Sequence, residues 1–305
     1  MIGQKADDQE TVFRRLYRPG GGTPLYHYCN TPSFLAILES GKLRFSDANM
    51  MNDGSEGRYG YALFERAANA LLDMATDNPV LEGLDAAFFD KIDAYLSPKQ
   101  LHSHPIIACF SKSPDVLSQW RAYASDGQGW SIGFPASALA AMPVSLLEVL
   151  YDPDQQLREV RNHLGAMYAI WKESEDRELT SIRTEVALFA SWLHAYKDPT
   201  FAEEQEVRAL HELRVDIGEN GLLLVDEGGV AEGAEVGGET VQFRTDGTSI
   251  TAFVDIPFRA GKGGEIIELW FGPRNNNGLG NALYPMTQYG HPGVRLRHSA
   301  SFYRG

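Results

Sequence analysis

The sequence predicts an α+β fold with mixed, mostly antiparallel sheets and helical insertions. Short runs of apolar or alternating residues, which are typical of strands, are dispersed among segments with helical periodicity. The two kinds of segment do not alternate regularly, as they would in a doubly wound parallel sheet. Because 43% of the 305 residues are hydrophobic and 22% are charged, the chain can bury a sizeable core.

The predicted strands are rich in aromatic and β-branched residues and are bounded by turn residues. The run at 106–111 is continuously apolar, as expected of a strand that is buried on both faces. Asp246-Gly247 separates two runs in the manner of a hairpin turn. In chain order, the predicted strands cover residues 25–29, 43–46, 106–111, 130–134, 146–151, 204–210, 241–244, 250–256, 266–271 and 294–298.

Helices are predicted where apolar residues recur with a period near 3.6. In the first helix Thr31 is a suitable N-cap, Pro32 suits the first helical position, and Gly41 suits the C-terminal cap. Two helical inserts are expected near residues 59–101 and 154–197, and shorter helices at 117–123 and 281–289.

The domain organisation follows from the breaks between these elements. Residues 1–22 are expected to form a flexible tail, because Pro19-Gly20-Gly21-Gly22 breaks any regular pattern. Residues 23–305 are then expected to form a single domain. The acidic, Gly-rich stretch at 218–240 is interpreted as an exposed excursion rather than a domain boundary.

Charge and cysteine content exclude several classes of function. The formal net charge is −14, and no run of Lys and Arg provides a strong nucleic-acid signature. The two cysteines are far apart, which predicts a reduced, cytoplasmic protein. No apolar run approaches the roughly 18 residues that span a bilayer, and the polar N-terminus excludes a signal peptide, so no membrane association is expected.

A pair of glutamates is the first candidate for chemistry. In a strand over 204–210, Glu204 and Glu206 would point to the same face, because side chains alternate with a period of two. Mutual repulsion would raise one pKa and leave the other group ionised, which suits a catalytic pair. The alternative is a solvated edge with ordinary ion pairs to the neighbouring Arg208.

Other candidate residues also have two interpretations. His27 is either a structural residue of its strand or a ligand contact. Trp120 and Tyr123, three residues apart on a helix, form either core packing or a stacking platform for a flat ring. Asn52, Asp53 and Glu56 form either a divalent-cation site or a turn. No Gly-rich phosphate loop, HExxH or GxSxG pattern is present. His102 and His104 form a His-x-His pair, but no cysteine or acidic cluster nearby completes a metal site, so no metal is predicted.

Eight short segments, in order over nearly the whole chain, resemble a bacterial family catalogued as domain of unknown function 2971. Its members are often encoded near defence and mobile-element genes. The segments are Leu25-Tyr26-His27-Tyr28, Ser40-Gly41-Lys42-Leu43, Asn52-Asp53 with Glu56, Cys109-Phe110-Ser111, Ser118-Gln119-Trp120-Arg121-Ala122-Tyr123, Gly129 with Ile132-Gly133-Phe134, Glu204-x-Glu206-Val207-Arg208, and Phe271-Gly272-Pro273-Arg274.

A second resemblance concerns the opening of the chain. Leu25-Tyr26-His27, a helix ending at Gly41 and a following strand are similar to the start of DarT-like and other ADP-ribosyltransferases. In those folds a first-strand His or Arg holds the NAD ribose, a central strand carries a Ser, and a late strand carries the catalytic Glu. The resemblance implies an ADP-ribosyltransferase-like fold, with His27, Ser111 and Glu206 at these positions and NAD as a substrate.

The same resemblance implies a role for each residue. Glu206 would stabilise the cationic ribose in the transition state, and Glu204 would activate the accepting nucleophile. His27 would donate a hydrogen bond to a ribose hydroxyl or to the cofactor backbone. The remaining implied NAD contacts are stacking on the nicotinamide by Tyr28, Trp120 or Tyr123 and pairing with the pyrophosphate by Arg44 or Arg121.

Three functions follow as expectations. The first is NAD-dependent ADP-ribosyl transfer to a macromolecular target in phage defence or stress response, with a regulatory protein partner. The second is a non-catalytic sensor or interaction module that uses the acidic surface and residues 218–240. The third is a metal-dependent hydrolase or nuclease built on Asn52, Asp53, Glu56 and Glu206.

Overall fold

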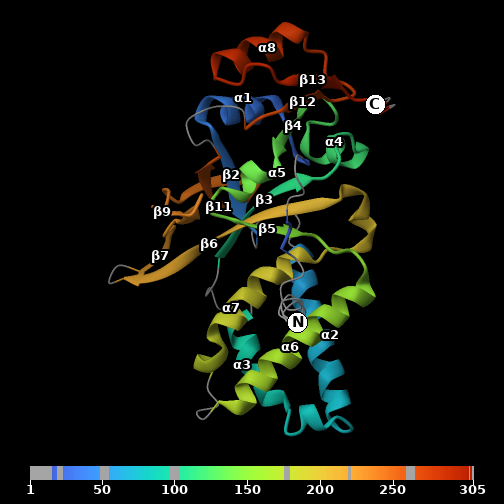
Figure 1. Cartoon of the computed structure of the whole chain (residues 1–305), viewed down its shortest axis with the longest axis vertical. Coiled ribbons are helices and arrows are strands. Elements are labelled where there is room, and N and C mark those ends of the chain that lie inside the picture. Colours follow the sequence, from blue (N-terminus) through green and yellow to red (C-terminus); the bar gives the residue numbers. More distant parts are fainter. Residues whose placement is uncertain are drawn as a thin grey trace, which may run out of the picture.

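The fold is α+β, as predicted, with one large sheet and a separate group of helices (Figure 1). A computed structural model describes residues 16–18, 23–48, 55–96, 104–174, 179–218, 221–258, 265–301 and 303, although the side chains at 55–57, 179 and 246 lie outside the description. Asn52 and Asp53, and the side chain of Glu56, are therefore outside the described residues, as is most of the expected tail. Within that tail, the amide of Tyr17 donates a hydrogen bond to Leu146 O, which attaches Tyr17 to the strand at Ser145–Glu148.

The large sheet has the strand order β10-β11-β2-β3-β1-β4-β12-β13, and β6 also pairs with β3, β5 and β7. Every strand pair described is antiparallel except β12 with β13. The strands are β1 (Pro24–Cys29), β2 (Lys42–Asp47), β3 (His104–Ser111), β4 (Trp130–Pro135), β5 (Ser145–Glu148), β6 (Glu206–Gly218), β7 (Gly221–Val225), β10 (Gln242–Asp246), β11 (Ser249–Pro257), β12 (Glu268–Phe271) and β13 (Arg295–His298), with β8 (Gly229–Ala231) and β9 (Ala234–Val236) as a separate hairpin.

The sheet is split at β3. On one side β3 pairs with β6 along its whole length, from His104 to Ser111. On the other side it pairs with β2 only at Ile106 and Ile107, and with β1 only at Ser111. Residues 108–110 pair with neither β1 nor β2, so these two strands diverge over the middle of β3.

The helix α1 (Thr31–Ser40) shows how local sequence defines an element beside this split. The N-cap is Asn30 rather than the predicted Thr31, because the Asn30 side chain accepts a hydrogen bond from the Ser33 amide at 2.8 Å. Gly41 ends the helix in the left-handed region at φ 64°, as the sequence predicts. The buried face of α1 carries Phe34, Ile37 and Leu38.

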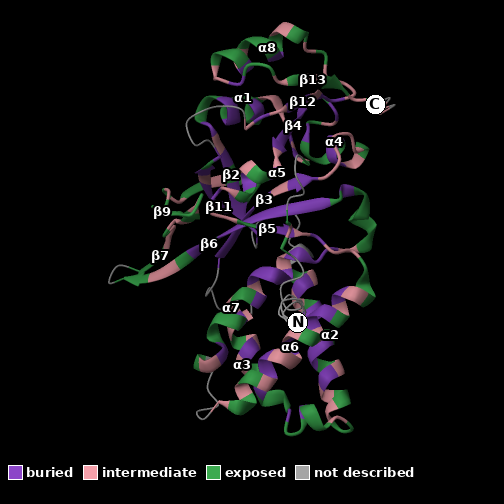
Figure 2. Ribbon diagram, viewed as in Figure 1, coloured by how far each residue is buried: buried purple, intermediate pink, exposed green. Residues whose placement is uncertain are grey.

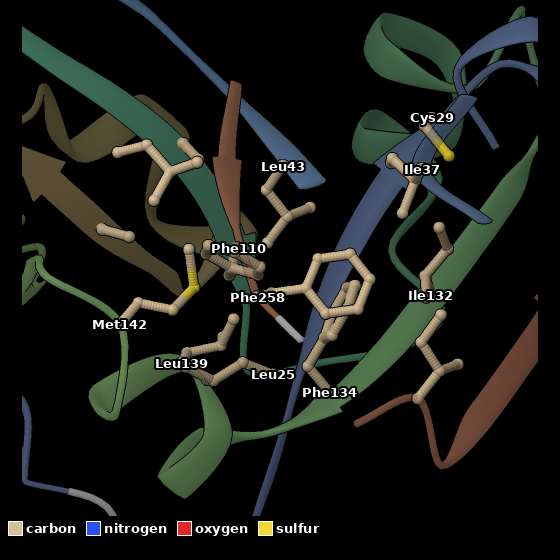
Figure 3. Close-up of a cluster of buried hydrophobic side chains, with 14 of the residues drawn as sticks. Leu25, Cys29, Ile37, Leu43, Phe110, Ile132, Phe134, Leu139, Met142 and Phe258 are labelled. Carbon is tan, nitrogen blue, oxygen red and sulfur yellow. The ribbon is translucent and has the colours of Figure 1, made fainter. Parts of the chain in front are cut away.

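The main core lies against one face of the sheet. In Figure 3 side chains of β1, β3 and β4 meet those of the following loops and helices, with Phe110, Phe134 and Phe258 close together. Phe134 meets Phe110 and Phe258 edge-on, with ring centroids 6.1 and 5.1 Å apart. The helices around the sheet are α4 (Leu117–Tyr123), α5 (Ala136–Ala140) and α8 (Leu279–Gln288), and the 3₁₀ segment η5 (Pro199–Glu204) precedes β6.

The two predicted helical inserts pack together and form a second core. This helical bundle lies at one end of the molecule, below the sheet in Figure 1. Aromatic contacts such as Phe88 with Tyr168 join the two inserts, although they are separated by β3, β4 and β5 in the sequence. The bundle consists of α2 (Ser55–Ala75), α3 (Ala86–Leu96), α6 (Pro153–Glu173) and α7 (Arg183–Trp192), with the 3₁₀ turns η2 (Pro79–Leu81), η3 (Leu179–Ile182) and η4 (Leu193–Ala195).

The acidic excursion is exposed but structured. Figure 2 shows that β6 is buried near the centre of the molecule and becomes exposed towards β7. Asp226 holds the excursion in place by accepting hydrogen bonds from the Gly228 and Glu239 amides, at 2.7 and 2.8 Å. Its carboxylate also binds His211 Nε2 at 2.8 Å. Residues 226–239 are thus tied to β6 rather than forming a loose loop.

Candidate functional site

A cavity of about 410 Å³ lies where β1 and β2 diverge, and we call it the β1–β2 cleft. Its walls come from β1, the start of α1, β2 and β10, and its floor includes Ala108, Cys109 and Phe110 of β3. The lining also includes Gln119 and Tyr123 of α4, Lys197, and Glu206 and Arg208 of β6. The cleft therefore exists because β3 is left uncovered between its short contacts with β1 and β2.

Five of the residues expected to form an NAD site line this one cleft: His27, Tyr28, Arg44, Tyr123 and Glu206. Four others are not part of its lining: Ser111, Trp120, Arg121 and Glu204. Each is a near neighbour in sequence of a residue that does line the cleft, but its own side chain makes contacts outside the cleft.

The expectation that Glu204 and Glu206 share one face of a strand is wrong. Glu204 ends the 3₁₀ segment η5, and β6 begins only at Glu206. Between them Gln205 adopts the left-handed conformation at φ 46°, which turns the chain. The two carboxylates are nevertheless linked, because Lys197 Nζ binds Glu204 Oε2 at 2.6 Å and Glu206 Oε2 at 3.1 Å.

Glu206 is buried and is held by two cations. Arg208 donates from Nε to Glu206 Oε1 at 2.9 Å and from Nη2 to Oε2 at 3.0 Å, forming a bidentate pair. Burial alone would raise the pKa of Glu206, but the charges of Arg208 and Lys197 outweigh it and lower this pKa to about 2. The expected like-charge pair is thus replaced by a carboxylate that is firmly ionised at neutral pH.

His27 is half-buried at the cleft, and its imidazole is neutral at neutral pH. Burial lowers the pKa of its imidazole, and the contact of Nδ1 with Cys109 O at 3.0 Å opposes this only in part. Because a carbonyl oxygen only accepts, that contact places the proton on Nδ1 and leaves Nε2 as an acceptor. The predicted role for His27 is therefore reversed: its second nitrogen can accept a hydrogen bond from a ribose hydroxyl but cannot donate one.

The aromatic residues divide between core and cleft. Trp120 is fully buried, donates from Nε1 to Asp115 at 2.7 Å, and packs edge-on against Tyr28 at 4.8 Å between centroids. The Tyr28 hydroxyl donates to Ser113 O and accepts from the Val116 amide, both at 2.9 Å. Tyr123 is 47% exposed, so its ring is the one that a ligand in the cleft can stack on.

The remaining predicted contacts have structural partners. Arg44 forms a bidentate pair with Asp255, at 2.9 and 3.0 Å, and its guanidinium lies 3.8 Å from the centroid of the Phe253 ring. Arg121 is exposed on α4, with its guanidinium carbon 5.8 Å from the centroid of the Tyr303 ring. The Ser111 hydroxyl donates to Glu204 O at 2.7 Å and accepts from the Ser113 amide, so it shapes the turn before β6.

Sequence reasoning missed three cations that line the cleft: Lys197, Arg208 and Arg244. Arg208 could have been predicted from the sequence, because it lies two residues from Glu206 and must share its face in a strand. Lys197 and Arg244 come from distant segments, and no local pattern identifies them. Among the described lining residues the cleft has four cationic side chains and one carboxylate, although the whole chain carries a formal charge of −14.

This charge balance favours an anion rather than a metal ion. A divalent cation beside Glu206 would meet the positive charges of Lys197 and Arg208. Among the residues that the structure describes, there is no group of three or more His, Cys, Asp and Glu placed to hold a metal. His104, from the His-x-His pair, instead binds Asp47 through Nδ1 at 3.0 Å.

Other hollows on the described part of the chain lack the combination of charged and aromatic groups that lines the β1–β2 cleft. One of about 340 Å³ lies beside the excursion, where Met142 and Phe258 provide apolar walls and Asp226 already has three hydrogen-bond partners. Another of about 560 Å³ lies over α2 and α3 on the helical bundle. The β1–β2 cleft is the candidate site because it joins cations, an ionised carboxylate, a neutral histidine and an exposed aromatic ring.

The lowered pKa of Glu206 makes a prediction about acid stability. Folding favours the ionised form, so its stabilisation is complete above the ordinary pKa of 4.5 and is lost as the pH falls towards 2. A difference of this size corresponds to about 3 kcal/mol. Urea unfolding should show wild type more stable than Glu206→Gln at pH 7, with the gap closing as the pH approaches 2. A gap that stays constant with pH would contradict the ion-paired assignment.

Comparison with known proteins supports the family resemblance. Residues 119–209 match the model of a family described as "Protein of unknown function (DUF2971)". This confirms the resemblance to that family over the matched segment, which carries Tyr123, Lys197, Glu206 and Arg208 of the cleft. No curated protein and no solved structure matches the chain. Among the described residues, no helix combines the length and apolar character needed to cross a membrane.

Proposed function

We propose that the β1–β2 cleft binds NAD and that the protein transfers ADP-ribose from it to a macromolecular acceptor. The observation that carries the proposal is the meeting of His27, Tyr28, Arg44, Tyr123 and Glu206 in one cavity, although they come from four separate parts of the chain. A volume of about 410 Å³ is in the usual range for small-molecule sites.

The binding chemistry of the cleft suits a dinucleotide. Lys197, Arg208 and Arg244 offer positive charge to a pyrophosphate, and guanidinium groups bind phosphate oxygens in pairs. The exposed ring of Tyr123 offers a face for the nicotinamide. His27 Nε2 accepts a hydrogen bond from a ribose hydroxyl, as its tautomer requires.

The proposed reaction breaks the bond between the ribose C1′ and the nicotinamide nitrogen. The electron pair of this bond leaves with the nicotinamide, and the ribose becomes a cation that the ionised Glu206 stabilises. A nucleophile of the acceptor then bonds to C1′ and releases its proton to solvent water. Glu204 supports this step indirectly, since it does not line the cleft but holds Lys197 at 2.6 Å.

A second candidate function is a sensor that binds the same ligand without turnover. It is favoured by one observation: both carboxylate oxygens of Glu206 already contact cations. For either function we propose a cytoplasmic setting, in phage defence or stress response, and a regulatory protein partner. Cys29 and Cys109 are not joined in a disulfide, which is consistent with a reducing compartment.

Thermal unfolding with and without NAD tests the binding site. A ligand at about 100 times its dissociation constant adds roughly 2.7 kcal/mol of stability, which raises the unfolding midpoint. We expect this shift in the wild type and a much smaller one in Tyr123→Ala. Arg121→Ala, on the same helix but outside the cleft lining, is the matched control and should keep the full shift.

The outcomes separate the two candidate functions. No shift at millimolar NAD in the wild type would exclude both of them. A shift together with release of nicotinamide supports the transferase, whereas a shift without release supports the sensor.

A further inference from the structure

We propose that Glu206 and the diphosphate of the ligand compete for the same two cations, Lys197 and Arg208. The cleft then selects ligands that carry a diphosphate, and only such ligands release the Glu206 carboxylate for catalysis. This inference rests on the proposed function only in taking a dinucleotide as the natural ligand. The replacement of Glu206 by a diphosphate at Lys197 and Arg208 would occur with any ligand that carries a diphosphate.

The resting contacts provide the first argument. Arg208 uses Nε and Nη2 to hold both oxygens of Glu206, at 2.9 and 3.0 Å, and Lys197 Nζ adds a third contact at 3.1 Å. The three side chains are each at most 4% exposed. A carboxylate engaged in this way offers little negative charge to a ribose cation, because the nearby positive charges neutralise its field.

The second argument is that the cations are anchored independently of Glu206. Arg208 Nη1 donates to His194 O at 2.7 Å, and Lys197 keeps Glu204 as a partner at 2.6 Å. The backbone of Lys197 is also fixed, because Gln156 Nε2 donates to its carbonyl at 2.8 Å. Both cations therefore stay at the cleft when their contacts to Glu206 are exchanged for contacts to a ligand.

The third argument concerns which ligand can make the exchange. Separating a buried ion pair is costly, and part of this cost is recovered when the two cations gain a new anionic partner. A diphosphate supplies two or more negative charges and oxygen pairs that match a guanidinium fork. Adenosine and nicotinamide riboside lack phosphate and cannot replace Glu206 as the partner of these cations. Phosphate-bearing nucleotides are therefore the substrate class that this arrangement selects.

Calorimetric titration of the full-length protein tests the competition. ADP and inorganic pyrophosphate are the probes, and adenosine is the uncharged comparison. In Glu206→Gln the competitor for the cations is removed, so we expect ADP and pyrophosphate to bind about tenfold more tightly than in the wild type. Adenosine binding should be unchanged. Glu203→Gln, which alters an exposed carboxylate in the adjacent η5 segment, should leave all affinities at their wild-type values.

A second variant covers the case in which Glu206→Gln does not fold. Glu206→Asp keeps the buried negative charge but withdraws it by one methylene, and we expect ADP to bind at least twofold more tightly. Unchanged or weaker ADP binding in the variants that fold overturns the proposal, as does wild-type protein that binds neither ADP nor pyrophosphate.

The inference and the proposed transferase can fail separately. Tighter ADP binding in the variants, with no nicotinamide released by the wild type, would keep the competition and reject the transferase. Nicotinamide release by the wild type, with no change of ADP affinity in the variants, would keep the transferase and reject the competition.

Discussion

Replacing Arg208 with leucine is expected to lower the free energy of unfolding by about 3–5 kcal/mol. Arg208 is 1% exposed, and its guanidinium binds Glu206 with two hydrogen bonds and His194 O with a third. Its removal leaves the buried Glu206 carboxylate with Lys197 as its remaining cation, and leaves the His194 carbonyl without this donor. Urea unfolding followed by circular dichroism measures the change directly.

Arg214→Leu is the matched control for this experiment. Arg214 lies on the same strand, but its side chain is about half exposed, and it pairs with Asp216 and Glu227 at the surface. Exposed ion pairs contribute little, so a change within about 0.5 kcal/mol is expected. An equal loss in the two variants would mean that the strand is sensitive to any substitution and that the Glu206 pair has no special role.

Glu206→Gln is expected to slow the release of nicotinamide from NAD by about 10²–10³-fold. Glutamine keeps the size of the side chain but removes the charge that stabilises the ribose cation. The rate is measured at saturating NAD, so that the tighter binding expected for this variant does not obscure the loss of turnover. Glu203→Gln should release nicotinamide at the wild-type rate. A Glu206→Gln protein with wild-type turnover would remove Glu206 from the reaction.

The sequence predicted those features of the fold that depend on local chemistry. Gly41 ends α1 because that position needs a positive φ, and Asp246-Gly247 joins β10 to β11 as a hairpin. The two helical inserts were also predicted, from apolar periodicity alone. Their packing into one bundle was not, because the order of segments along the chain does not reveal which apolar faces meet.

Some residues of the candidate site were predicted from the sequence and others were missed, and the reason for each success or failure differs between residues. Glu206 was identified from its spacing to Glu204 and again through a resemblance, His27 through the resemblance, and Tyr123 through its spacing from Trp120. The interpretation of Glu204 was wrong because one residue, Gln205, takes a left-handed conformation that no alternating pattern reveals. Lys197 was missed because its role comes from contacts with two carboxylates, that of Glu204 at the end of the 3₁₀ segment η5 and that of Glu206 beyond it. These are effects of tertiary structure and leave no periodic signal in the sequence.

The contact between Gln156 and Lys197 has a consequence for shortened versions of this protein. Gln156 belongs to α6, is fully buried, and binds the carbonyls of both Leu150 and Lys197 through Nε2. Its Oε1 accepts a hydrogen bond from the Tyr59 hydroxyl of α2 at 2.7 Å. Lys197, which binds both Glu204 and Glu206, is thus held in place by helices from both inserts. A fragment trimmed to the sheet alone would lose that support, so the smallest piece able to keep the cleft intact includes the helical bundle.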